Sequence, residues 1–212
     1  MKKILFQGDS ITDCRRERTD EFYKMFYGLG SGYANLSAGE LGYKYPGEYE
    51  FLNRGIGGNR VTDLYARIKA DIINLKPDYM SILIGVNDVW HEVARKDGVS
   101  AERYEKIYDM LISEILEALP DIKIMILEPF VLKGTGTEEN WDFFHSEVLK
   151  RAAVAKRIAE KYKLKFIPLQ EKFDEASKNT KEPYWTLEGV HPTVSGHRLI
   201  ANEWLKAFEE IK

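Results

Sequence analysis

The chain has 212 residues, of which 44% are hydrophobic and 31% charged, and its net charge is −3. This length and composition are typical of one globular domain, so we expect residues 1–212 to form a single domain around one core. The charge shows no basic footprint of the kind that binds nucleic acid or anionic lipid, and we expect neither partner.

The N-terminal segment and the cysteine count bear on location and on metal sites. Two lysines precede the apolar run Ile4-Leu5-Phe6, which stops at Gln7. A secretory signal needs about 7–15 apolar residues and a membrane span about 20, so we expect a cytoplasmic protein. The single cysteine, Cys14, excludes an internal disulfide and a zinc site built from cysteines.

Short apolar runs alternate with longer helical patterns along the chain. In order, we predict a strand at Lys3–Gln7, a loop and then a helix around Gly28–Gly39, a strand at Tyr49–Asn53, a helix at Val61–Leu75, a strand at Tyr79–Ile84, a helix at Ala101–Leu119, a strand at Ile122–Leu127, a helix at Asn140–Tyr162, a strand at Lys165–Ile167 and a helix at Val194–Ile211. Strands that alternate with helices of this length predict a parallel sheet with helices on both faces. The predicted fold is α/β, a three-layer α/β/α sandwich with a five-stranded parallel sheet.

Four polar or glycine-rich segments lie where such a fold binds its ligands, at the carboxyl ends of the strands. Three of them follow the first three predicted strands, and the fourth precedes the last helix: Gly8-Asp9-Ser10, Asn53–Asn59, Gly85-Val86-Asn87-Asp88 and Glu188-Gly189-Val190-His191-Pro192. We therefore expect all four to meet at one edge of the sheet.

Together these segments contain the groups that a serine hydrolase needs. A serine hydroxyl becomes a good nucleophile beside a base, usually a histidine that a carboxylate orients. Ser10 is the predicted nucleophile, His191 the base, and Glu188, three residues earlier, the orienting carboxylate. Each donor to the oxyanion of the tetrahedral intermediate lowers the barrier by roughly 3–4 kcal/mol. The predicted donors are the backbone N–H groups of Ser10 and Gly58 and the side-chain amide of Asn87.

In order and spacing these segments resemble the SGNH hydrolases, also called the GDSL esterase/lipase family. The resemblance extends from Lys3 to about Trp204, with Ile11 where the family name has leucine. It implies a flavodoxin-like sandwich and a serine esterase that needs no metal or organic cofactor. The blocks Gly8–Asp13, Ile82–Trp90 and Gly189–Thr193 are most similar to those of short members that remove acetyl groups from carbohydrates. The implied substrate is a small acyl ester, above all acetyl, on a sugar.

One position departs from the family pattern. The last block of the family reads Asp-x-x-His, whereas this chain has Glu188-Gly189-Val190-His191. Glutamate orients a histidine in some α/β-hydrolases, but its side chain is one methylene longer than that of aspartate. We expect Glu188 to orient His191, with a backbone carbonyl or another carboxylate as the alternative.

Four further residues are candidates to contact the substrate. Trp90 and Trp185 adjoin catalytic blocks, where an aromatic ring offers a surface for a sugar; the alternative for both is packing. Arg60 lies beside the glycine-rich block and is otherwise a solvated cation. Asp9 precedes the nucleophile, and its alternative role is a hydrogen bond that fixes the turn of Ser10.

Other functions stay open at this level. A lipid acyl hydrolase, of the lysophospholipase or thioesterase type, would use the same catalytic groups. A binding protein for acylated sugars would keep the fold without the chemistry, but both Ser10 and His191 are present. The sequence leaves the oligomeric state open, with a homo-oligomer as one alternative.

Overall fold

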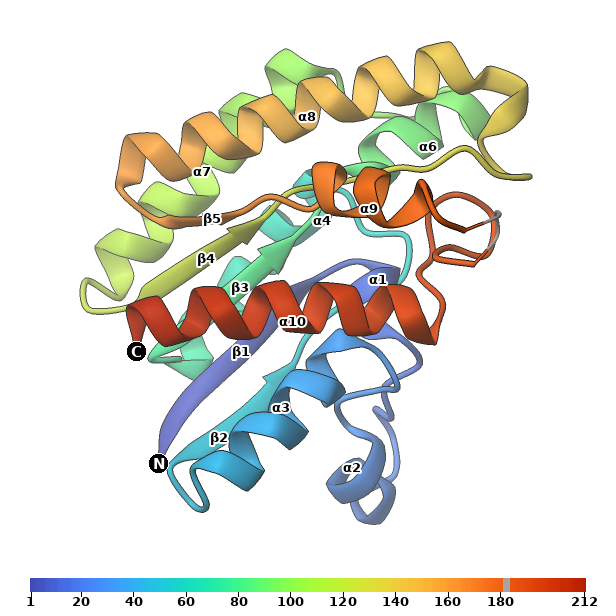
Figure 1. The fold of residues 1–212 in the computed structure, drawn as a ribbon. Coiled ribbons are helices and arrows are strands. Elements are labelled where there is room, and N and C mark those ends of the chain that lie inside the picture. Colours follow the sequence, from blue (N-terminus) through green and yellow to red (C-terminus); the bar gives the residue numbers. More distant parts are fainter. Residues whose placement is uncertain (181–183) are drawn as a thin grey trace.

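The computed structural model describes residues 1–180 and 184–212, and its strands form one five-stranded sheet (Figure 1). All neighbouring strands are parallel. The strands are β1 (Lys2–Gly8), β2 (Tyr49–Asn53), β3 (Tyr79–Leu83), β4 (Lys123–Leu127) and β5 (Lys165–Ile167). Their order, β2-β1-β3-β4-β5, is the flavodoxin-like order. The predicted fold class is therefore confirmed.

Helices cover both faces of this sheet, which explains why every residue of the central strand β3 is buried. Figure 1 shows α3 (Tyr33–Lys44) and α10 (Val194–Ile211) on one face, with α7 (Ala101–Ala118) and α8 (Trp141–Tyr162) on the other. Successive side chains of a strand point to opposite faces. Accordingly, Ile4 and Phe6 of β1 belong to the core under α3 and α10, whereas Leu5 belongs to the core under α7 and α8.

The remaining helices are short and lie mainly in the connections. They are α1 (Ser10–Asp13), α2 (Glu21–Tyr27), α4 (Val61–Ala66), α5 (Ile68–Asp71), α6 (Val86–Arg95) and α9 (Gln170–Ser177), with 3-10 turns at Ile73–Leu75 and Glu138–Asn140. In the described parts of the chain, no helix combines the length and the apolar character needed to cross a bilayer.

The short helices α2 and α9 were not predicted from the sequence, and two further differences bear on the site. The helix predicted at Val61–Leu75 is divided at Arg67, whose backbone (φ −110°, ψ 14°) ends α4. The Arg67 side chain binds the loops after β1 and β2 there, so tertiary contacts override the helical pattern. The second difference is α6, which begins directly after Gly85; turn-forming residues at its start concealed it.

Candidate active site

Ser10 lies at the turn between β1 and α1, where its neighbours fix the backbone closely. A Cβ on Gly8 would stand 2.4 Å from the backbone oxygen of Leu83 and equally close to Thr12, so only glycine fits. The carboxylate of Asp9 accepts the N–H of Ile11 at 3.0 Å and thereby caps α1. As the first residue of this helix, Ser10 has a backbone N–H without a partner inside the helix.

The histidine and the carboxylate of the predicted triad are in place beside Ser10. Ser10 Oγ lies 2.8 Å from His191 Nε2. On the other side of the ring, His191 Nδ1 hydrogen-bonds Glu188 Oε1, and the same oxygen accepts the backbone N–H of His191 at 3.0 Å. The structure thus brings the three residues into one chain of hydrogen bonds. The longer glutamate side chain is accommodated by bonding within its own turn.

Glycines on a neighbouring loop hold the backbone of Glu188. A Cβ on Gly134 would stand 2.6 Å from the Glu188 carbonyl carbon, and one on Gly136 would stand 2.9 Å from its side chain. The N–H of Gly136 donates to the Glu188 carbonyl at 2.9 Å, and the N–H of Leu132 donates to the Gly189 carbonyl at 2.8 Å. The loop after β4 therefore packs against the backbone of Glu188 and hydrogen-bonds it, which fixes the position of the carboxylate.

The electrostatics of the pair suit a base that becomes protonated during the reaction. The hydrogen bond to Glu188 raises the pKa of His191, and partial burial opposes this rise. Burial raises the pKa of Glu188, but hydrogen bonds from His191 outweigh that effect and leave the pKa below its usual value. Glu188 is therefore ionised at neutral pH and stabilises an imidazolium at His191.

The predicted oxyanion donors border the same cavity as Ser10. Gly58 has a φ of +80°, a left-handed conformation that favours glycine. Asn87 lies in the first turn of α6, and its side-chain amide donates one hydrogen to the Asn59 carbonyl at 3.2 Å. The second hydrogen of that amide is left for a ligand. Asp13 of α1 accepts the N–H of Gly57 at 3.1 Å, which ties the glycine loop to the nucleophile's helix.

Buried polar groups join the second and third blocks. Asp88 is fully buried, and its carboxyl accepts the N–H of Val61 at 3.2 Å. Burial raises the pKa of Asp88 to about 8. Asp88 thereby connects the start of α6, which carries Asn87, to the start of α4, which follows Gly58.

Arg67 is a supporting residue that sequence reasoning missed. Its guanidinium donates to the Arg54 carbonyl at 2.9 Å, to the Asn59 side chain at 2.8 Å and to the Gly8 carbonyl at 3.3 Å. It also pairs with Asp71 at 2.9 Å. One side chain thus connects the loops after β1 and β2. Within the sequence Arg67 was one polar position of a helical pattern, and no local signal distinguished it.

The cavity at the triad has a volume of about 370 Å³, and α6 forms one of its walls. It is lined by Ser10, Gly58, Asn87, Trp90, His91, Ala94, Arg95 and His191. The ring of Trp90 lies 5.9 Å from that of His191, centre to centre. Of the lining residues, His91 was suggested by its position near Asn87, whereas Ala94 and Arg95 were not predicted. They share a helix face with Asn87 and Trp90 at spacings of three and four, so recognising α6 would have found them.

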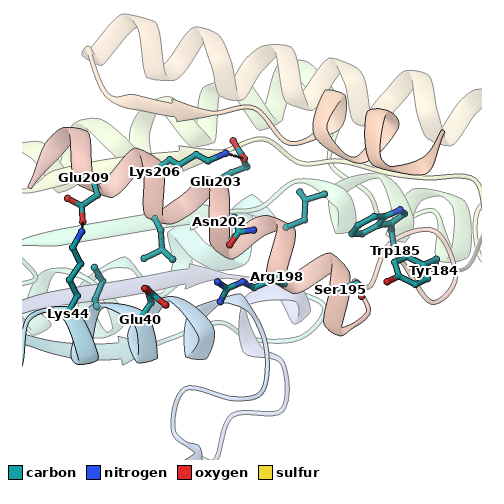
Figure 2. A pocket seen from close by; sticks show the side chains of 13 residues that line it. Glu40, Lys44, Tyr184, Trp185, Ser195, Arg198, Asn202, Glu203, Lys206 and Glu209 are labelled. Atoms are coloured by element: carbon teal, nitrogen blue, oxygen red, sulfur yellow. Dashed lines mark hydrogen bonds and ion pairs between the residues drawn. The ribbon is translucent and has the colours of Figure 1, made fainter. Parts of the chain in front are cut away.

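The other three candidate substrate contacts lie outside this cavity. Asp9 is only 1% exposed and caps α1. Arg60 forms ion pairs with Asp63 and Asp97, both at 3.0 Å. Trp185 lies with Tyr184 at one end of a separate groove of about 770 Å³ between α3 and α10, which Figure 2 shows. The structure therefore brings Trp90 to the triad and leaves Asp9, Arg60 and Trp185 apart from the cavity.

Residues 6–199 match the GDSL-like Lipase/Acylhydrolase family. The chain belongs to this family. The acetylxylan esterase of Geobacillus stearothermophilus is 36% identical over 211 residues, which cover 97% of this chain and 93% of that protein. Its crystal structure has a TM-score of 0.85 at 34% identity, again over 97% and 93% of the two chains. The structure of a protein from Parabacteroides merdae assigned to the GDSL-like lipases has a TM-score of 0.90 at 36% identity, over 98% and 95%.

These similarities confirm the family and the enzyme class predicted from the sequence. The protein is a carboxylic ester hydrolase of the GDSL, or SGNH, type. Among the residues that the structure describes, no group of three or more His, Cys, Asp or Glu side chains has the arrangement of a metal site.

Proposed function

We propose that the protein is a serine esterase that removes small acyl groups, chiefly acetyl, from carbohydrates. The observation that carries the proposal is the continuous chain from Ser10 Oγ through the His191 ring to Glu188, at the edge of a cavity bordered by Gly58 and Asn87. The N–H groups of Ser10 and Gly58 and the amide of Asn87 form the proposed oxyanion hole.

The reaction proceeds by transfer of the acyl group to Ser10 and then to water. His191 Nε2 accepts the proton of Ser10 Oγ while the oxygen attacks the ester carbonyl. The oxyanion donors stabilise the tetrahedral intermediate, and Glu188 stabilises the imidazolium. His191 then gives its proton to the leaving sugar hydroxyl. A water repeats these steps on the acyl-enzyme and releases the acid. Every step uses groups of this chain, so we propose that no metal or organic cofactor takes part.

The relatives and the cavity support this choice of substrate. The relative from Geobacillus stearothermophilus is an acetylxylan esterase, and its catalytic mutants replace a serine, an aspartate or a histidine with alanine. These residue types correspond to a triad of the proposed kind, with glutamate in place of aspartate here. The cavity of about 370 Å³ is small for a ligand site. Trp90 at its wall provides an aromatic surface for a sugar ring.

Hydrolysis of p-nitrophenyl esters of increasing chain length tests both parts of the proposal. Wild type should prefer the acetyl ester and release acetate from acetylated xylo-oligosaccharides. Ser10→Ala should lose at least about 10³-fold in kcat, while Ser31→Ala, a serine in an exposed loop, serves as the matched control. Equal rates for wild type and Ser10→Ala would refute the mechanism. A preference for long acyl chains would instead favour a lipid acyl hydrolase.

The location and the other partners stay predictions. We propose that the protein has no nucleic-acid or anionic-membrane partner, because its charge shows no basic cluster.

A further inference from the structure

Helix α2 presents an apolar surface that meets no core. Five of its seven residues are large and apolar, and all five are between 50% and 77% exposed: Phe22, Tyr23, Met25, Phe26 and Tyr27. The structure describes the whole of α2, and none of its residues is buried. Figure 1 shows the helix set apart from the sheet, beyond the end of α3. An apolar face this dense normally packs against another element.

The apolar face is also unusually wide. At 100° per residue the five side chains spread over roughly 200° of the helix circumference, whereas a helix that packs on a core needs a stripe of about 100°. Aromatic pairs run along it, with ring centres 5.4 Å apart for Phe22 and Phe26 and 6.2 Å apart for Tyr23 and Tyr27. The surface of α2 is therefore a continuous aromatic patch.

Local hydrogen bonds stabilise α2, although the helix packs against no core of this chain. Asp20 caps its first turn by accepting the N–H groups of Phe22 and Tyr23, and the Glu17 N–H donates to the Tyr27 carbonyl at 2.9 Å. A free helix shorter than about 12–15 residues is marginal in water. With seven residues and no buried side chain, α2 needs a surface to pack against.

The exposed area is of the size that a protein interface requires. At about 200 Å² for each large side chain, the five residues leave on the order of 600 Å² of mostly apolar surface in solvent. The largest patch on an ordinary monomer is about 300–600 Å². A stable interface buries about 800 Å² on each partner. The α2 patch alone thus approaches one side of a dimer interface.

The charge of the patch favours a second copy of this chain over other occupants. Its one cation, Lys24, is paired with Glu21 on the same helix. Just before the helix, Arg15, Arg16 and Arg18 lie among acidic residues, so residues 13–27 carry four basic and four acidic side chains and no net charge. Anionic lipid would require a net basic cluster beside the aromatic rings. A sugar chain needs several hydrogen-bonding groups around a stacking ring, and the apolar face offers only the hydroxyls of Tyr23 and Tyr27. A surface that is apolar and nearly neutral is complementary to itself, as a two-fold interface must be.

We propose that α2 is a self-association surface, through which two copies of the chain pack helix against helix across a two-fold axis. The patch from Phe22 to Tyr27 forms the interface core on each copy. This inference does not depend on the substrate or on the catalytic mechanism.

Sedimentation equilibrium between about 1 and 100 µM chain tests the proposal. Wild type should have twice the chain mass of 24.5 kDa, and the double variant Phe22→Ser/Phe26→Ser should have the mass of one chain. The matched control is Tyr43→Ser, which removes an 88% exposed aromatic from α3 and should leave the dimer intact. Because α2 buries no side chain within one chain, the double variant should still unfold cooperatively, with a Tm that no longer rises with protein concentration as that of the wild-type dimer does.

A disulfide cross-link provides a second measurement, which detects the dimer directly and does not require a variant that breaks it. In a Cys14→Ser background, Phe26→Cys should form a disulfide-linked dimer under mild oxidation, whereas Tyr43→Cys should form no disulfide between the two chains of its dimer. A wild type with the mass of one chain over the whole range would overturn the proposal. So would a dimer that survives in the double variant. Monomeric wild type that is retarded by xylan in a native gel, with the retardation lost in the double variant, would overturn it in favour of a polysaccharide.

Discussion

Replacing Glu188 with glutamine removes the charge of the triad's third member while keeping its shape. In the structure, Glu188 Oε1 accepts both the backbone N–H and the Nδ1 hydrogen of His191. A glutamine can serve both donors only through its oxygen, because its amide nitrogen carries hydrogens itself. We therefore expect the variant to hold the imidazole in the same tautomer, with Nε2 free to accept the proton of Ser10.

What Glu188→Gln loses is the stabilisation of the imidazolium that forms when His191 takes the proton. A hydrogen bond to a charged group contributes about 1.5–3 kcal/mol, and one between neutral groups about 0.5–1.5 kcal/mol. A difference of about 1.4 kcal/mol corresponds to a tenfold change in rate. We expect kcat to fall about tenfold and KM to change little, since Glu188 does not line the cavity. Glu188→Ala leaves Nδ1 without its acceptor and should lose on the order of 10³–10⁴-fold.

The measurement is p-nitrophenyl acetate hydrolysis from about pH 5 to 9, a range that spans the titration of histidine. Since the carboxylate raises the pKa of His191, the acid limb of kcat/KM should move to lower pH in Glu188→Gln. Glu139→Gln, in the exposed turn before α8, is the control. A wild-type rate with an unmoved acid limb would show that another group orients His191. A loss as deep as that of Glu188→Ala would refute the idea that the backbone N–H selects the amide oxygen.

In wild type, only neutral His191 accepts a proton and its pKa is raised by Glu188, so the kcat/KM profile should have an acid midpoint above about 6.5; a midpoint below that contradicts the assignment. Asn87→Ala should lower kcat about 10²–10³-fold on p-nitrophenyl acetate, whereas a change confined to KM would assign Asn87 to binding alone. Gly8→Ala should destabilise the fold by about 1–3 kcal/mol, because its Cβ would stand 2.4 Å from a backbone oxygen of β3; an unchanged Tm in calorimetry argues against this packing. The buried carboxyl of Asp88 has a pKa raised to about 8, against about 3.9 in the unfolded chain, so the folded state keeps a proton that the unfolded state releases. Stability to urea should therefore fall as pH rises from about 4 to 8, and Asp88→Asn should flatten this slope; equal slopes in the two proteins would rule out the assignment.

The fold and the catalytic centre were predictable because their signals are local and independent. Each strand is an apolar run that ends in glycine, proline or a polar residue, and the alternation with helices determines the sheet type. Ser10 and His191 belong to short blocks whose order matches a family pattern. The structure confirms the five parallel strands and brings Ser10, His191 and Glu188 together as expected. Their catalytic roles stay predictions until the variants are measured.

The sequence could not show features that depend on contacts between distant segments. Arg67 interrupts a regular helical pattern because its guanidinium binds the Gly8 and Arg54 carbonyls, which become neighbours only in the folded sheet. Trp185 is six residues before His191, yet the intervening loop directs its ring toward the groove between α3 and α10 (Figure 2). The sequence around Arg67 or Trp185 does not indicate which part of the folded chain either side chain contacts.

One wall of the cavity at Ser10 is formed by a single helix, α6. The residues that shape this wall therefore differ from the proposed catalytic residues Ser10 and His191. Asn87 in its first turn is the proposed oxyanion donor, whereas Trp90, His91, Ala94 and Arg95 farther along line the rest of the cavity. Ala94 and Arg95 are exposed side chains that no core contact constrains. Substitution of these two residues can therefore change the shape of the substrate cavity without moving Ser10 or His191. A library confined to two turns of one helix would be the natural route to esterases with other preferences on this scaffold.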